Sequence, residues 1–123
     1  MLDQRVMKEG AGWRLGWNPE APVYKGLVGG DGWAFELTEA ELSDFCRLLE
    51  RLAVTIDSIA NELMEEERIA CQLESNSLWL EAEGYPHAYE VRLLLSCSRQ
   101  CEGNWHSHAI LPLLEAARTL TVF

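Results

Sequence analysis

The residues that could do chemistry most directly are two cysteines and two histidines near the C-terminus. They follow the pattern Cys97-x3-Cys101-x4-His106-x-His108, and thiolates and imidazoles are ligands that tetrahedral zinc prefers. The spacing differs from that of a zinc knuckle, and a straight strand would hold Cys97 and Cys101 too far apart. Partly buried thiols and surface histidines are the simpler interpretation, so we expect no bound metal. A small zinc protein or enzyme built on this segment stays open as the third alternative.

Motifs for other kinds of catalysis are missing from the sequence. Cys97 and Cys101 do not form a C-x-x-C pair, no G-x-S-x-G elbow occurs, and neither His87 nor His106 has an evident acidic orienter nearby in the sequence. The glycines match neither the dinucleotide fingerprint nor the phosphate-binding loop. The sequence therefore predicts a protein that is not an enzyme and has no cofactor.

Residues placed to contact a partner are better candidates for function. Trp79 alternates with Leu78 and Leu80, so it would lie on the polar side of a strand, where an aromatic side chain is a plausible contact. Tyr85 and His87 belong to the turn that follows. We expect these three residues, Trp79, Tyr85 and His87, to form an interaction patch.

Several acidic residues lie on the same hairpin as Trp79. Glu81, Glu83 and Glu90 flank the turn together with Arg92. Ion pairs between neighbouring strands explain these charges without catalysis.

The formal charge of -10 is concentrated in one segment. Residues 38–67 contain nine acidic and two basic residues, whereas the segments before and after carry only -1 and -2. Such runs are usually solvated helix faces. The alternative is an acidic surface for a basic partner, with Glu62, Glu65 and Glu66 as candidate contacts. The total charge counts against general electrostatic binding to DNA, RNA or an anionic membrane.

The elements that must position these residues follow from the apolar spacing. Alternation of apolar and polar residues predicts three strands within residues 12–37 and three within 69–95. The polar segment 96–106 is predicted to be an edge strand or an ordered loop.

Two helices complete the pattern. A long helix over 38–64 begins at a capping box formed by Thr38 and Glu41. The acidic run 65–67 is unfavourable at a helix C-terminus, so the last turn should fray. A shorter helix is predicted at about 110–120, where Pro112 is tolerable only within the first turn.

The order of elements predicts an α+β fold with an internal duplication. Each β-β-β(-β)-α unit would contribute an antiparallel sheet and a helix, one helix long and one shorter. Trp33 before the first helix and Trp105 before the second occupy comparable places. We expect a single domain over 1–123, with pseudo-repeat halves at about 12–64 and 68–120.

The long helix suggests a homodimer. Its apolar residues recur at alternating steps of three and four along its whole length. A helix over 38–64 would be about 40 Å long, whereas a compact monomer of this size is about 35 Å across. Either the helix breaks near Val54 and Thr55 or a second protomer covers the remainder, and we predict the dimer.

The composition points to the cytoplasm. The N-terminal residues alternate charged with apolar side chains and lack the apolar core of a signal peptide. No stretch approaches the roughly 20 apolar residues of a membrane span. The four cysteines (Cys46, Cys71, Cys97 and Cys101) are best interpreted as reduced thiols.

Four stretches of the chain resemble a family of small uncharacterised cyanobacterial proteins. They are residues 12–19 (GWRLGWNP), 24–30 (YKGLVGG), 36–49 (ELTEAELSDFCRLL) and 78–87 (LWLEAEGYPH). The resemblance implies a cyanobacterial cytoplasm and a fold similar to the Whirly and single-stranded-DNA-binding transcriptional regulator domains. That family has no established activity, so the resemblance supplies no catalytic residues.

The leading hypothesis is a non-catalytic module that binds an unidentified protein partner or has a regulatory role. The alternative is a regulator that binds single-stranded nucleic acid on the same fold. Such binding needs a basic groove with stacking aromatics, for which the sequence offers Arg14, Lys25, Arg92 and Arg99.

Overall fold

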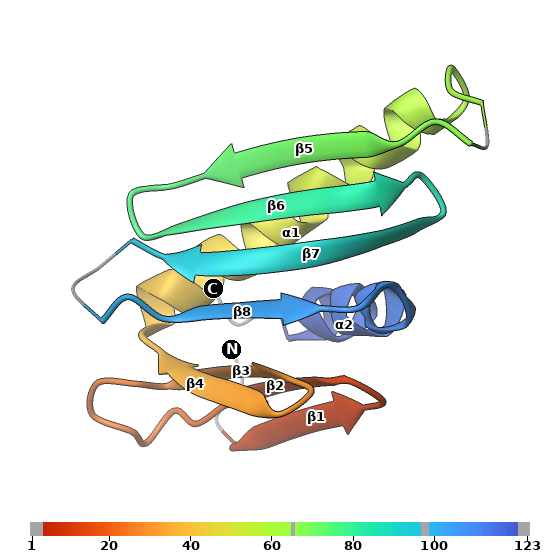
Figure 1. Cartoon of the computed structure of the whole chain (residues 1–123). Helices are drawn as coiled ribbons and strands as arrows, with labels where there is room; N and C mark the ends of the chain where they lie inside the picture. Colours follow the sequence, from red (N-terminus) through yellow and green to blue (C-terminus); the bar gives the residue numbers. More distant parts are fainter. Residues whose placement is uncertain (1–3, 65, 97–98, 121–123) are drawn as a thin grey trace.

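The computed structural model of the chain describes residues 4–64, 66–96 and 99–120 (Figure 1). Each half of this part of the chain is a meander of four antiparallel strands followed by a helix. The expected α+β architecture with a duplicated unit is therefore confirmed. The elements are β1 (Val6–Gly10), β2 (Trp13–Trp17), β3 (Gly26–Gly30), β4 (Trp33–Leu37), α1 (Glu39–Ala60), β5 (Ile69–Glu74), β6 (Leu78–Tyr85), β7 (Ala88–Leu95), β8 (Glu102–Trp105) and α2 (Ser107–Thr119).

The N-terminal sheet consists of β1 to β4 in chain order. Leu15, Val28 and Phe35 are neighbours across three strands, on the side that faces the core. Strand β1 was not predicted from the sequence. It is an edge strand whose inward-facing Lys8 donates a hydrogen bond to the Thr119 hydroxyl, so it lacks the apolar alternation of an inner strand.

The C-terminal sheet consists of β5 to β8, also in chain order. Leu80 and Leu93 are partners across β6 and β7, and both are fully buried. Within the segment 96–106, residues Glu102–Trp105 form the edge strand β8. In Figure 1 this sheet is seen face-on, with α1 and α2 behind it.

Helix α1 begins as predicted and ends earlier than predicted. Thr38 and Glu41 form the expected capping box, but the helix stops at Ala60 and is about 33 Å long. The acidic residues that follow are unfavourable at the negative end of the helix dipole. The helix runs unbroken through Val54 and Thr55.

The apolar seam of α1 is covered within one chain. Its members from Leu42 to Ile56 are buried, Ile59 is partly buried against the core, and so is Leu63 beyond the end of the helix. A second copy is not needed to cover the helix, so the length argument for a dimer no longer applies. The homodimer itself stays a prediction.

Helix α2 begins three residues earlier than predicted, at Ser107. Pro112 therefore lies in the second turn, which corrects the expectation that the helix tolerates it only in the first. The missing N–H removes one hydrogen bond, to the carbonyl of His108. His108 is exposed, so water can satisfy that carbonyl and the helix continues.

Two tryptophans join the two sheets. Trp105 of β8 is fully buried and donates a hydrogen bond of 2.8 Å from Nε1 to the carbonyl of Gly29 in β3. Trp33 of β4 donates one of 3.0 Å to the carbonyl of Asn104 in β8. The two rings meet edge to face, with centroids 5.0 Å apart. The comparable tryptophans of the two halves thus contact each other.

Candidate functional site

The outer face of the C-terminal sheet is the side that points away from the helices. In Figure 1 it is turned toward the viewer, and no element lies over it. Because side chains alternate along a strand, the buried Leu78 and Leu80 point inward and Trp79 points outward. The structure therefore places Trp79 where the sequence predicted.

Trp79 lies between an apolar and a charged neighbour. Its partners on the adjacent strands are Glu74 and Leu94, and the guanidinium carbon of Arg92 is 5.8 Å from the centroid of its ring. This separation is within the range of a cation–π contact. Trp79 is only partly buried, so the ring keeps surface available to a partner.

An acidic groove adjoins Trp79 on the same face. It has a volume of about 190 Å³. Arg92 pairs with Glu102 at 3.4 Å rather than with Glu81, its partner in the strand register. Glu81 instead accepts a hydrogen bond from the side-chain amide of Gln72. The groove is lined by Glu81, Glu83, Glu90, Val91, Arg92, Glu102 and Asn104.

Two carboxylates of this groove lie directly opposite each other. Glu83 of β6 is the cross-strand partner of Glu90 of β7, an arrangement that destabilises a sheet. Arg68, at 3.2 Å from Glu83, offsets part of this charge from outside the pair, and His106 Nδ1 lies 3.0 Å from Glu90. The expected cross-strand ion pairs thus do not explain these two glutamates.

The other predicted contact residues are distributed over two surfaces. Tyr85 shares the outer face with Trp79, and its ring is 5.3 Å from the guanidinium carbon of Arg68. Tyr85 lies six positions after Trp79 along β6, which corresponds to about 20 Å. His87, in the turn after β6, lines a different groove between α1 and α2. The structure therefore does not bring Trp79, Tyr85 and His87 together.

The acidic tail of α1 forms a separate exposed segment. Glu62 and Glu66 are both exposed, and neither makes an ion pair within the parts of the chain that the structure describes. Glu65 lies outside the described residues.

The zinc candidates are not arranged around a common point. His106 Nδ1 is 3.0 Å from Glu90, a carboxylate that is distant in the sequence. The rings of His106 and His108 are stacked with centroids 6.1 Å apart, and the Cys101 thiol contacts the carbonyl of Arg99 at 3.8 Å. Across residues 4–64, 66–96 and 99–120, no group of three His, Cys, Asp or Glu residues could hold a metal ion. Cys97 lies outside the described residues.

The basic residues considered for nucleic-acid binding are already engaged. Arg14 pairs with Glu9 at 3.6 Å, and Arg92 pairs with Glu102. Lys25 donates to the carbonyls of residues 19 and 21. Among the described residues, Lys25 lines a groove together with Tyr24, the ring on which Arg99 stacks.

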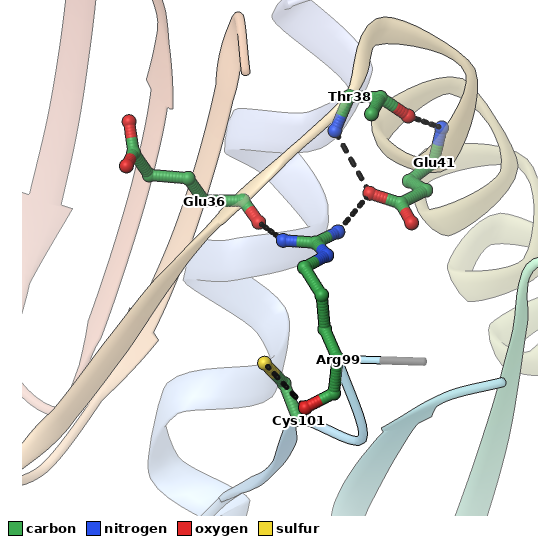
Figure 2. A network of polar contacts seen from close by, with 5 residues as sticks. All are labelled: Glu36, Thr38, Glu41, Arg99 and Cys101. Carbon is green, nitrogen blue, oxygen red and sulfur yellow. Dashed lines mark hydrogen bonds and ion pairs between the residues drawn. The ribbon is translucent and has the colours of Figure 1, made fainter. Parts of the chain in front are cut away.

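Arg99, the fourth of these basic residues, makes several contacts at the start of α1 (Figure 2). Its guanidinium pairs with the buried carboxylate of Glu41 and donates a hydrogen bond of 2.5 Å to the carbonyl of Glu36. The same carboxylate oxygen accepts from the backbone N–H of Thr38. Arg99 also stacks on Tyr24, with 4.7 Å between its guanidinium carbon and the ring centroid. The sequence predicted the capping box but not the arginine that completes it.

Comparisons with known proteins identify a family and a fold. The model of a family described as a domain of unknown function, DUF1818, matches residues 8–120. The chain is also similar to a solved protein of unknown function from the cyanobacterium Prochlorococcus sp. NATL2A, described as from the DUF155 family. The identity is 28% and the TM-score 0.89, over 94% of this chain and 98% of that one. No curated protein matches.

These comparisons bear on part of what the sequence predicted. They confirm a family of unknown function with a cyanobacterial relative. The likeness to Whirly domains stays a prediction. Neither helix in the described part of the chain is long and apolar enough to cross a membrane.

Proposed function

The chain belongs to DUF1818, a family of domains of unknown function, and we propose that it is a non-catalytic module that binds a protein partner in the cytoplasm. The surface is the outer face of the C-terminal sheet, and the partner presents a basic segment. The observation that carries the proposal is the Glu83–Glu90 pair, two carboxylates in direct opposition on an uncovered face that also presents Trp79.

The opposed glutamates favour a cationic partner. Like charges across a strand pair cost stability, and a lysine or arginine from a partner would turn this repulsion into attraction. Both side chains are more than half exposed, so a partner can reach them without rearrangement of the sheet. Charges at such a surface mainly accelerate association and set specificity.

Trp79 supplies the apolar part of the same surface. Tryptophan is among the residues that most often dominate binding energy at interfaces. Leu94 beside it adds apolar area, and Arg92 holds one side of the ring. A tryptophan surrounded by carboxylates matches a partner segment that mixes basic and apolar residues.

A protein partner fits this surface better than nucleic acid does. Binding of single strands requires a positive groove that follows the phosphates. The groove beside Trp79 carries four glutamates and one arginine, and that arginine is paired with Glu102. Phosphates would be repelled from this surface.

The proposal is tested by affinity capture from a cyanobacterial extract with the wild-type chain and surface variants. Trp79→Ala and Glu83→Gln should each lose the same protein partners. Met7→Ala and Glu20→Gln, which alter exposed residues of the N-terminal half, should keep them. Variants that reverse the charge of Glu62, Glu65 and Glu66 measure how much these acidic residues contribute to partner binding.

Stability measurements sharpen this experiment. Glu83→Gln removes both the repulsion from Glu90 and the exposed ion pair with Arg68. It should therefore change the free energy of unfolding by less than about 0.5 kcal/mol. A substitution that does not harm the fold and yet removes the partner marks a binding surface. Equal capture by the wild type and all variants would refute the proposal, as would salt-dependent retention on single-stranded oligonucleotides in place of protein.

A further inference from the structure

A second groove lies between the two helices, at the end where β6 turns into β7. Ala53 of α1 and Ile110, Leu111 and Leu114 of α2 form its apolar walls. Leu111 is 61% exposed. These residues provide an apolar channel that opens to solvent.

One carboxylate of this groove forms no ion pair among the described residues. Asp57 of α1 lines the groove and makes no ion pair among the residues that the structure describes. Arg118 also lines it, but Glu50 accepts two hydrogen bonds from its guanidinium, at 2.6 and 3.1 Å. Arg118 also interacts electrostatically with Asp57, but because its hydrogen bonds go to Glu50, the three groups together leave one net negative charge at the groove.

Tyr89 extends the polar end of the groove. Its side chain is half-buried, and burial, followed by the negative charge of Asp57, raises the pKa of its hydroxyl. The hydroxyl therefore stays protonated at neutral pH and is available to hydrogen bonding. A cation near Asp57 would lie beside a neutral phenol.

The size of the groove limits what it holds. Its volume is about 220 Å³, whereas typical sites for small organic molecules have about 300–1,000 Å³. A single long side chain suits this space better than a whole cofactor or metabolite. The flexible stems of lysine and arginine pack on apolar surface while their charged ends remain polar.

We infer that this groove binds an arginine or lysine side chain of a partner polypeptide. The aliphatic stem lies along Ile110 and Leu111, and the charged end meets Asp57 and the Tyr89 hydroxyl. The inference rests on the proposed function in one respect, namely that the partner is a protein with a basic segment. It adds a second contact, at the opposite side of the β6–β7 hairpin from Trp79.

The experiment uses two short peptides and the full-length chain labelled with ¹⁵N. The probes are acetyl-Gly-Arg-Gly-amide and the same peptide with citrulline, which keeps the shape of arginine and lacks its charge. Chemical-shift changes on titration locate the bound peptide. The arginine peptide should shift residues 57, 89 and 110–114, and the citrulline peptide should bind roughly fivefold more weakly because it loses a charge-assisted hydrogen bond.

Variants of the chain separate the contribution of the carboxylate from that of the apolar walls. Asp57→Asn should weaken the arginine peptide by roughly fivefold, since a neutral amide replaces the carboxylate. Leu111→Ser should lower the affinity of both peptides equally, because it removes apolar surface from the groove and leaves its charge unchanged. Glu20→Gln removes one acidic charge outside the groove and should not change the affinity of either peptide.

The outcomes distinguish the inference from the proposed function. Shifts confined to the outer face of the C-terminal sheet would overturn the groove and keep the proposed surface. Shifts at the groove alone would support the inference and count against Trp79 as the main contact. Shifts at neither place, or equal affinity of the two peptides, would overturn the inference that the groove binds a cationic side chain. Line broadening that depends on protein concentration would instead indicate a second copy of the chain as the occupant.

Discussion

Trp79 and Trp105 show how one residue type serves two purposes in this chain. Both lie in strands of the same sheet, but Trp105 points inward and is fully buried, whereas Trp79 points outward and touches Arg92. Truncating a buried tryptophan costs about 3–5 kcal/mol. The outward tryptophan contributes far less to the fold, and its exposure is what makes it available to a partner.

The cysteines can be distinguished at the same scale. Burial raises the pKa of the Cys46 thiol to about 12. Cys46 therefore carries about a thousandfold less thiolate at pH 8 than a thiol with the ordinary value of 9.0. Since the thiolate is the nucleophile, Cys46 is a packing residue and not a reactive centre.

Alkylation tests this assignment of Cys46. In the native protein its reaction with iodoacetamide should stay slow from pH 7 to 10, because the raised pKa keeps the thiol protonated. In urea the rate should rise as pH approaches 9. Mass spectrometry of the peptide that contains Cys46 measures both rates. Equal rates in the folded and unfolded chain would show that burial does not protect it.

At the scale of elements, the start of α1 is the most strongly determined junction. Thr38 and Glu41 satisfy each other's backbone N–H groups, and Arg99, from the connection between β7 and β8, binds the same carboxylate. Glu41 is 8% exposed. A carboxylate this well buried is costly without a cation, so Arg99 ties the C-terminal half to the first helix.

Replacing Arg99 should therefore cost more than replacing a surface arginine. Arg99→Ala is expected to lower the free energy of unfolding by about 2–3 kcal/mol, because it leaves the buried carboxylate uncompensated. Arg14→Ala, which breaks the exposed pair with Glu9, should cost less than about 1 kcal/mol. Urea denaturation measures both values. Similar costs for the two variants would show that the Arg99 pair behaves like a surface pair.

At the scale of the whole molecule, the two halves depend on a close approach at β8. A Cβ atom on Gly103 would lie 2.4 Å from the ring of Trp33. The hydrogen bond to Asn104 and stacking on Phe35 hold that ring in place. The absence of a side chain at residue 103 is therefore what lets Trp33 join the two sheets.

A double-mutant cycle tests this junction. Gly103→Ala should lower the free energy of unfolding by about 1–3 kcal/mol through overpacking. Trp33→Phe makes room, so adding Gly103→Ala to it should cost less than Gly103→Ala alone. Thermal or urea unfolding of the two single variants and the double variant gives the coupling. Strictly additive effects would mean that the two residues do not meet.

The sequence predicted much of the local structure because local spacing encodes it. Alternation located the strands from Trp13 onward, and steps of three and four located α1 together with its cap. Strand β1 was not predicted, because an edge strand with few buried side chains shows little alternation of apolar and polar residues. The end of α1 and the start of α2 were misplaced, since electrostatics and packing against neighbours set helix ends.

For the candidate site, the sequence by itself determined which way single side chains point. It placed Trp79 on the polar side of its strand, because adjacent side chains in a strand face opposite sides. Only the tertiary structure decided the neighbours: Glu90 opposite Glu83 and beside His106, His87 in the groove between the helices, and Arg99 on Glu41. Periodicity fixes an orientation within one element, whereas pairings between distant residues depend on how the sheets and helices pack.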